Sequence, residues 1–416
     1  RYTSIYTKMY KEYISITLVF IMRYGIYLCI RSKYILTGRE EMEERKVQRV
    51  GRNTLTVSIP YWWARKYGLN QGDVIYVEEN SIGALVLWPR KMEVERRFRG
   101  CSINADLCHQ PGLLQRLIIA SYVLGMDLIE VFSKERLRYT NLREIREAME
   151  SLMGISIMKE DEQHVVLQCF LNILNFPIYS IIRRIYDLAA SMHKESIKAL
   201  FEEDRDLARR VIIRDKEVNK MYYLLLRALS TAQKTKNLAE KLGIEDPPTE
   251  VPCLKTIGYC IERMADWSKI ISKSVLRILT CDTKLDQKFL QKLAKFDQVC
   301  QEVHRKAIDA FLSKNLELAN EAVHKYQEEV ANKGGEILKQ VRYEHSKCEQ
   351  NTLCPHFTFI LWGISRQAEL GAEIAEISID MNLKSRPDII QVGMVSKEEI
   401  KGLIEKHDDD DIFNFS

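Results

Sequence analysis

The sequence predicts a multi-domain protein with a small β-rich barrel, a small α/β segment and a long all-α region. Three observations predict this fold class. A short stretch before residue 90 alternates apolar and polar side chains with a period of two. From about residue 178 to residue 382 the apolar side chains recur at helical spacing instead. An internal repeat within that long stretch indicates two copies of a three-helix unit.

The first 41 residues differ from the rest of the chain. They include seven tyrosines and the apolar run Ile14–Ile30, which Arg23 interrupts. A run of this length with an internal arginine is short for a membrane span, and no small-residue cleavage site follows it. Because the chain begins with arginine and Met42 directly precedes the first recognisable domain, we interpret residues 1–41 as a non-native upstream extension. A membrane anchor is the less favoured alternative.

Residues 42–91 have the expected order strand, strand, helix, strand, strand. Leu55, Val57 and Ile59 alternate with polar residues, which predicts a strand with one buried face. Pro60 suits the first turn of the helix YWWARKY, because a proline there loses no helical hydrogen bond. A unit of this size is too small to bury a core of its own. We therefore expect a second copy to complete it, in a homodimer.

Basic residues gather on or beside the first predicted hairpin, opposed only by Glu43 and Glu44. Such a local cluster is informative because the net charge of the whole chain, +4, indicates no partner. A dimer would present the cluster twice, and paired basic patches suit a DNA duplex. The alternative is a surface hairpin whose charges are only solvated. The predicted DNA-binding residues are Arg45, Lys46, Arg49, Arg52 and Asn53.

This stretch resembles the swapped-hairpin DNA-binding domain of the AbrB/SpoVT type, in which two chains interlace one barrel. The resemblance rests on the run RKVQRVGRNTLTVSIPYWWARKYGLNQGDVIYVEE. It implies a β-rich swapped-hairpin barrel that dimerises and binds DNA.

The segment 92–172 has a mixed pattern, and we interpret it as an α/β connecting segment. Neither this segment nor the rest of the sequence offers a catalytic constellation, so we expect a protein that is not an enzyme. The ten cysteines are scattered without a C-x-x-C pair, which indicates reduced thiols and a cytoplasmic location. We expect strands at 92–99 and 127–132, helices at 112–124 and 141–152, and a hairpin formed by 155–159 and 164–170.

The all-α region contains an ungapped internal repeat. Residues 193–213 match residues 304–324, with histidine, isoleucine, alanine and leucine recurring at the same places. The equivalent His193 and His304 are interpreted as packing or polar-boundary residues. Breaks in the pattern divide the region into a first bundle at 178–280, a second bundle at 285–382 and a C-terminal tail at 383–416. Helix-length runs cover 178–202, 204–240, 253–280, 285–313, 315–346 and 356–382.

Runs such as IYDLAASMHKESIKALFEED and CIERMADWSKIISKSV resemble the PhoU family, phosphate-uptake regulators built as paired three-helix bundles. The combination of both resemblances is closest to archaeal proteins that carry an AbrB-type domain before a PhoU-like region. It implies a DNA-binding regulator of phosphate homeostasis whose bundles sense phosphate status through a partner or a metal. The alternative is an adaptor that negatively regulates a phosphate ABC transporter. It would dock on the ATPase subunit or on a phosphate sensor protein, and its barrel would only dimerise.

In the PhoU family, carboxylates four residues apart hold metal ions in some members. Here Asp215 with Asn219 and Glu262 with Asp266 have that spacing, which puts each pair on one helix face. Asp215 interrupts an apolar row, where a carboxylate is costly unless it is ion-paired or metal-bound. The resemblance implies a divalent or iron-type metal ion in the first bundle, and oxygen ligands favour magnesium, manganese or iron. The candidates for ion pairing instead are Lys220, Arg263 and Lys269.

The sequence departs from the family pattern. Asn219 stands where a second carboxylate is usual, and Trp267 stands where histidine is frequent. In the second bundle Ser365 and Glu369 replace the pair of the first bundle. We therefore expect at most one weakened metal site, in the first bundle.

Overall fold

The structure is a computed structural model that describes residues 44–52, 54–79, 85–89, 99–280, 287–331, 354–383 and 389. The chain divides into two compact units, residues 1–96 and 97–416, and each is described by itself. Residues 1–41, which we interpret as an upstream extension, lie outside the described residues, as does nearly all of the C-terminal tail at 383–416. None of the described helices is both long and apolar enough to cross a membrane.

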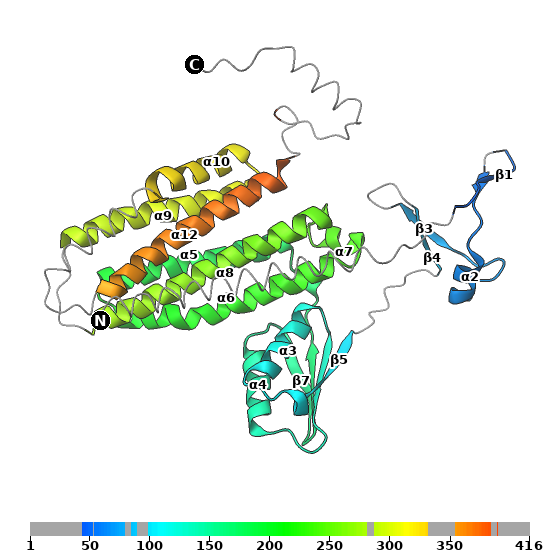
Figure 1. Ribbon diagram of the computed structural model, residues 1–416, viewed down its shortest axis with the longest axis horizontal. Helices are drawn as coiled ribbons and strands as arrows, with labels where there is room; N and C mark the ends of the chain where they lie inside the picture. Colours follow the sequence, from blue (N-terminus) through cyan, green and yellow to red (C-terminus); the bar gives the residue numbers. More distant parts are fainter. Residues whose placement is uncertain are drawn as a thin grey trace, which may run out of the picture. The chain divides into compact units, whose positions relative to one another are not determined.

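The N-terminal unit has the expected element order (Figure 1). Pro60 precedes its helix, and Gly68, with a left-handed φ of 64°, ends it by donating its N–H to the carbonyls of Ala64 and Arg65. The two strands of each hairpin pair antiparallel. The elements are β1 (Gln48–Val50), β2 (Thr54–Thr56), α2 (Tyr61–Tyr67), β3 (Tyr76–Glu79) and β4 (Leu85–Trp88).

The described part of this unit forms two separate two-stranded hairpins and no closed barrel. The predicted buried face is wrong for the single chain, because Leu55 and Val57 are 66% and 56% exposed. Ile59 is half-buried. No side chain of the unit whose burial is described counts as buried. The physical reason is size, since two short hairpins and two helical turns offer no second layer to cover an apolar face.

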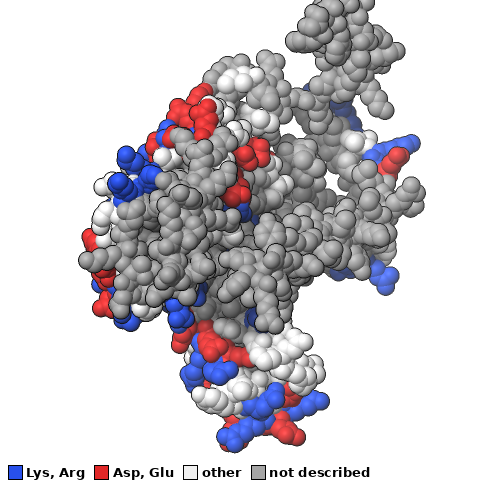
Figure 2. Space-filling view, turned by 60° about the vertical axis from the view of Figure 1, so that its left-hand side comes forward, with Lys and Arg blue, Asp and Glu red and all other residues white. Residues whose placement is uncertain are grey.

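The α/β segment is a four-stranded sheet with the order β5-β6-β8-β7, in which β5 and β6 are parallel and the other pairs antiparallel. The core residues Ile118, Ile129, Ile145 and Leu167 are each no more than 1% exposed. In the lower part of Figure 2 basic and acidic side chains alternate on this segment, as on a solvated surface. The elements are β5 (Gly100–Asn104), α3 (Leu113–Val123), β6 (Leu128–Phe132), α4 (Tyr139–Glu150), β7 (Ile155–Glu160) and β8 (His164–Cys169).

The predicted helices and hairpin of this segment are confirmed to within a few residues. The first strand is not. Residues 92–98 lie outside the described residues, and the structure instead places β5 at Gly100–Asn104. Its sequence, GCSIN, is short and half polar, so its periodicity is too weak to predict a strand.

The all-α region begins at Ile178 and contains long helices in both predicted bundles. In the second bundle the helix predicted at 315–346 is described only as far as residue 331, and its remainder lies outside the described residues. The single helix expected at 204–240 is wrong, because it ends at Ala232 and a new helix starts after Thr235, whose hydroxyl accepts the N–H of Leu238. The elements are α5 (Ile178–Phe201), α6 (Arg205–Ala232), α7 (Lys236–Lys241), α8 (Pro247–Ile278), α9 (Gln287–Ser313), α10 (Leu316–Lys325), the π-helical turn η3 (Tyr326–Ala331) and α12 (Cys354–Met381).

The internal repeat is visible in the backbone. Glu203 and Lys314 are 111 positions apart, and both have a φ of 53° in the turn between two helices. The next residues, Asp204 and Asn315, both cap the following helix by accepting backbone N–H groups. The repeated sequence therefore folds into the same helix–turn–helix twice.

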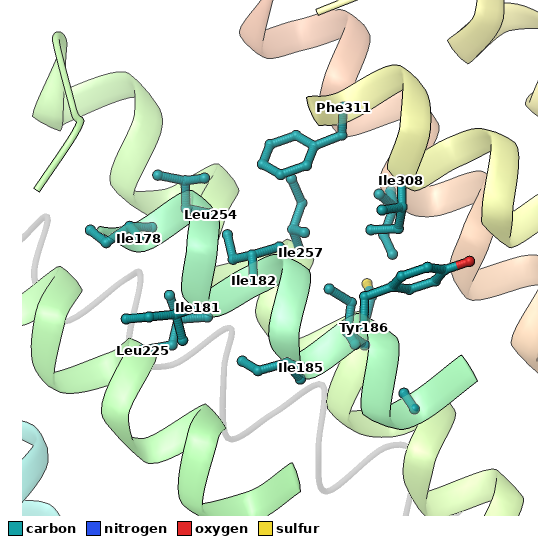
Figure 3. Packing of buried hydrophobic residues seen from close by; sticks show 14 of the residues in the cluster. Ile178, Ile181, Ile182, Ile185, Tyr186, Leu225, Leu254, Ile257, Ile308 and Phe311 are labelled. Atoms are coloured by element: carbon teal, nitrogen blue, oxygen red, sulfur yellow. The ribbon is translucent and has the colours of Figure 1, made fainter. Parts of the chain in front are cut away.

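The two three-helix units share their core. Ile182 and Ile257 of the first unit belong to the same buried cluster as Ile308 and Phe311 of the second (Figure 3). All four side chains are at most 1% exposed. The first unit therefore buries part of its apolar surface against the second and not only within itself.

The α/β segment is attached to the first bundle through Arg227 of α6, which is 3% exposed. Its Nη1 donates to the carbonyl oxygen of Tyr122, at the end of α3, at 2.7 Å. It also donates to the carbonyl oxygen of Met126, just after α3, at 2.9 Å. Its Nη2 lies 2.8 Å from Asp127 Oδ1, and the guanidinium covers the Tyr122 ring. A buried guanidinium with these partners fixes the segment to α6.

Candidate functional site

The predicted site in the first bundle begins with Asp215 on α6, which is 6% exposed. Val211 and Val218 beside it are buried, which confirms that the carboxylate interrupts an apolar row. Lys269 Nζ on α8 lies 2.5 Å from Asp215 Oδ2, and Asn219 Nδ2 donates to the same oxygen at 3.3 Å. Asp215 thus has an ion-pair partner from the neighbouring helix, as its burial requires.

The second predicted pair lies on α8 beside this ion pair. Arg263 Nη1 donates to Asp266 Oδ2 at 2.7 Å, and Lys269 Nζ lies 3.9 Å from Asp266 Oδ1. Burial, with the Asp266 carboxylate nearby, raises the pKa of Glu262 to about 7. Burial also raises the pKa of Asp266, against the opposing effect of Arg263. These carboxyl groups therefore share one partly buried, charge-dense position.

The structure brings all four predicted residues together, in what we call the acidic cluster: Asp215, Asn219, Glu262 and Asp266. Of the three predicted ion-pair partners Lys269 and Arg263 contact the cluster, whereas Lys220 pairs with Glu217 at 3.3 Å.

Tyr223 of α6 lies close to the acidic cluster. Burial raises its pKa, and the carboxylates of Glu262, Asp215 and Asp266 add to the effect. Tyr223 also packs against the core of the α/β segment. The cluster and that segment therefore share a neighbour on α6.

The acidic cluster has the oxygen donors that magnesium, manganese or iron would accept. In this geometry, however, the Lys269 ammonium supplies positive charge at the Asp215 oxygen. Within the described ranges, no group of three or more His, Cys, Asp and Glu is placed to hold a metal ion. Ion pairing is the alternative that the geometry shows, and metal binding stays a prediction.

The second bundle repeats half of this arrangement. Arg366 and Glu369 lie 103 positions after Arg263 and Asp266, and they form the equivalent ion pair three residues apart. Arg366 Nη2 also lies 3.4 Å from Glu373. The second bundle thus keeps the arginine–carboxylate pair.

The predicted DNA-binding residues lie on and around the first hairpin. Arg49 is on β1, and Arg52 follows Gly51 in the turn. Both side chains are exposed, as are those of Arg45 and Lys46. Asn53 lies outside the described residues. The four described basic side chains are thus accessible to a partner.

His193 and His304 are packed in the core, as one of the two sequence interpretations expected, but they also form a hydrogen-bonded network that the sequence analysis did not predict. Both are buried, and His193 Nδ1 lies 3.2 Å from His304 Nε2. His193 Nε2 lies 2.7 Å from Asp297 Oδ1, and His304 Nδ1 lies 3.0 Å from the Tyr186 hydroxyl. The repeat offered a signal, since Tyr186 and Asp297 each lie seven residues before one of the histidines. We call these four residues the buried relay.

Comparison with known proteins bears on the helices that hold the acidic cluster. Residues 182–275 match the family model of the PhoU domain. The matched range runs from α5 into α8 and includes all four cluster residues. The match shows a PhoU domain over this part of the helical region. It does not reach residues 42–91, so the resemblance of that stretch to the AbrB type stays a prediction.

Among solved structures the chain is similar to PhoU from Pseudomonas aeruginosa, with 16% identity and a TM-score of 0.44 over 50% of this chain and 96% of that one. It is also similar to the phosphate transport system regulatory protein PhoU from Streptococcus pneumoniae, with 16% identity and a TM-score of 0.42 over 52% and 96%. A search of the curated proteins finds no match.

Proposed function

We propose that this chain regulates phosphate uptake as a PhoU-type adaptor, acting through protein contacts of its helical region. The observation that carries the proposal is the PhoU-domain match over residues 182–275, a range that runs from α5 into α8 of the helical region. The proposed partner is the ATPase subunit of a phosphate ABC transporter or a phosphate sensor protein, in the cytoplasm. On this proposal the protein is a regulator and not an enzyme.

The acidic cluster is the candidate for the responsive part of the first bundle. Its ion pairs join α6 to α8 through Lys269, and Tyr223 brings the same helix against the α/β segment. A change of charge in the cluster would therefore alter the contact between two packed helices. A divalent or iron-type metal is the alternative source of positive charge. Elemental analysis of protein purified without chelators would test it, and stoichiometric metal would favour that alternative.

DNA binding by the first hairpin is the second candidate function. The observation that favours it is the exposure of Arg45, Lys46, Arg49 and Arg52 on and just before one small hairpin. With about four phosphate contacts in each protomer of a dimer, the log–log dependence of affinity on salt would have a slope on the order of −7. We propose that a second copy of the N-terminal unit would double this basic surface and cover its exposed apolar side chains.

Charge reversal separates the two functions. In the full chain, Arg49→Glu with Arg52→Glu would abolish salt-sensitive DNA binding and leave binding to the ATPase subunit unchanged. If regulation of phosphate uptake survives the double variant while dimers persist, the adaptor function is supported. If regulation is lost and DNA binding with it, the DNA-binding function replaces it.

A further inference from the structure

The hydrogen bonds of the buried relay all donate in one direction, from Tyr186 toward Asp297. Asp297 accepts two hydrogen bonds, from Gln301 Nε2 at 2.6 Å and from His193 Nε2 at 2.7 Å. With His193 neutral, its Nδ1 is an acceptor and receives the N–H of His304 Nε2. His304 Nδ1 then accepts the Tyr186 hydroxyl proton. These tautomers are assigned from the hydrogen-bond network, and they pair both ring nitrogens of each histidine.

This arrangement does not allow both imidazoles to be protonated to the cationic form at the same time. A protonated imidazole donates from both nitrogens, so two protonated rings would oppose two N–H groups across the 3.2 Å contact between His193 and His304. Two separated histidines would each take up a proton near pH 6.5. The relay can therefore hold at least one proton fewer than the same residues hold when the helices are apart.

Apart from Asp297 itself, the charged groups described near the relay are paired with one another. Arg183 and Asp187 on α5 form one ion pair near Tyr186, and Arg305 and Asp309 on α9 form another. Cys300 lies beside Asp297, and burial keeps its thiol protonated by raising its pKa. On α12 Gly371 packs against the His304 backbone and carries no side chain. Burial, followed by the effect of His193, lowers the pKa of His304 well below its ordinary value.

The relay joins the two halves of the repeat. Tyr186 and His193 lie on α5 of the first bundle, whereas Asp297 and His304 lie on α9 of the second. Asp297 and His304 lie 111 positions after Tyr186 and His193, so each residue occupies the repeat position equivalent to another member of the relay. The contacts cross between the halves, with Tyr186 bonded to His304 and Asp297 bonded to His193. Any change in the relay thus acts on the interface between the bundles.

We propose that the buried relay is a proton-sensitive lock, which holds α5 against α9 near neutral pH and weakens that contact in mildly acidic solution. The lock opens when the helices separate far enough for both imidazoles to be protonated. Proton uptake on opening gives the equilibrium its pH dependence. The opening constant is the equilibrium constant for the separation of α5 from α9. If the closed form holds one proton fewer than the open form, this constant rises about tenfold from pH 7.5 to pH 5.5, for an unfolded histidine that titrates near 6.5.

Hydrogen exchange of the full chain at pH 7.5 and pH 5.5, corrected for the intrinsic exchange rate, tests the lock. Around residues 186–193 and 297–304 the opening constant is expected to rise about tenfold at the lower pH. The variant His304→Gln can still donate to His193 and accept from Tyr186, but it cannot be protonated. Its opening constant is expected to change less than about twofold between the two pH values.

The matched control is His324→Gln, on the exposed side of α10, which is expected to keep the tenfold change. A wild-type opening constant that is the same at both pH values would overturn the proposal, as would a tenfold change in His304→Gln. If that variant does not fold, NMR titration of the wild-type imidazoles decides. One of the two rings must stay neutral down to pH 5.5, and titration of both within the folded protein contradicts the lock.

Discussion

The N-terminal unit and the helical region differ in how far their regularly spaced apolar side chains are buried. In the helical region Val211, Val218 and Leu225 recur at helical spacing and are each no more than 1% exposed. In the N-terminal unit Leu55 and Val57 follow an equally regular alternation and are mostly exposed. A periodic pattern therefore indicates which side chains need burial. It does not indicate whether the same chain supplies the covering surface.

The difference follows from the size of the elements. Helices α6 and α8 are 28 and 32 residues long, so each presents several turns of apolar surface to its neighbours. Strands β1 and β2 are three residues long, and within the described part of the chain they pair only with each other. Apolar burial contributes in proportion to the area removed from water. We therefore expect the helical region to be stable by itself, and we propose that the N-terminal unit is completed by a second copy.

The largest effect within the self-sufficient region is expected at Arg227. Arg227→Met removes three hydrogen bonds and leaves the buried carbonyl oxygens of Tyr122 and Met126 without this donor. The free energy of unfolding should fall by about 3–5 kcal/mol, measured by urea denaturation. Arg209→Met, at an exposed ion pair of the same helix, is the control and should cost less than about 1 kcal/mol. Equal losses in both variants would refute the role of Arg227.

A smaller loss is expected at Lys269. Lys269→Met leaves the buried Asp215 carboxylate without its cation, and the free energy of unfolding should fall by about 2–4 kcal/mol. Adding Asp215→Asn removes the unpaired charge and should recover at least half of that loss. A double-mutant cycle in chemical denaturation measures the coupling between the two residues. Additive losses would show that the two residues are not an ion pair.

Glu262 is expected to give a gain instead. Its pKa is raised to about 7, so the folded chain holds this proton more tightly than the unfolded chain does. The ionised carboxylate therefore costs stability, a cost that grows from about pH 4.5 to pH 7 and is absent in more acidic solution. Glu262→Gln should stabilise the protein by about 1–3 kcal/mol at pH 8 and by almost nothing at pH 4. A thermal-denaturation series over pH would contradict this if the gain did not depend on pH.

The smallest effect on the helical region is expected from the N-terminal unit. Leu55→Ser with Val57→Ser removes exposed apolar surface, and unfolding of the helical region should change by less than about 0.5 kcal/mol. The same double variant should weaken self-association, since it alters the surface that a second copy would cover. Hydrogen exchange of α5 and α8 measures the first effect. A large loss of protection there would show that the two regions are not independent.

The sequence predicted most of the long helices, because their apolar periodicity extends over many turns, but it did not predict the break after Ala232. It also predicted the four residues of the acidic cluster, since a spacing of four places the two members of each pair on one helix face. Lys269 could only be one candidate among three, because the helix packing decides which cation reaches Asp215. The buried relay and Arg227 were missed for a related reason. Their partners lie about 100 or more residues away in the chain, where local periodicity carries no information about contacts. The internal repeat shows that the relay residues occupy equivalent positions, but it does not show that they touch.

We propose that a second copy of the chain completes the N-terminal unit, and sedimentation equilibrium of the full chain at about 10 μM tests this. The expected species has twice the mass of 48.6 kDa, and Leu55→Ser with Val57→Ser shifts it toward the monomer. A stable monomer of 48.6 kDa whose β1 and β2 amides are protected from exchange would contradict it.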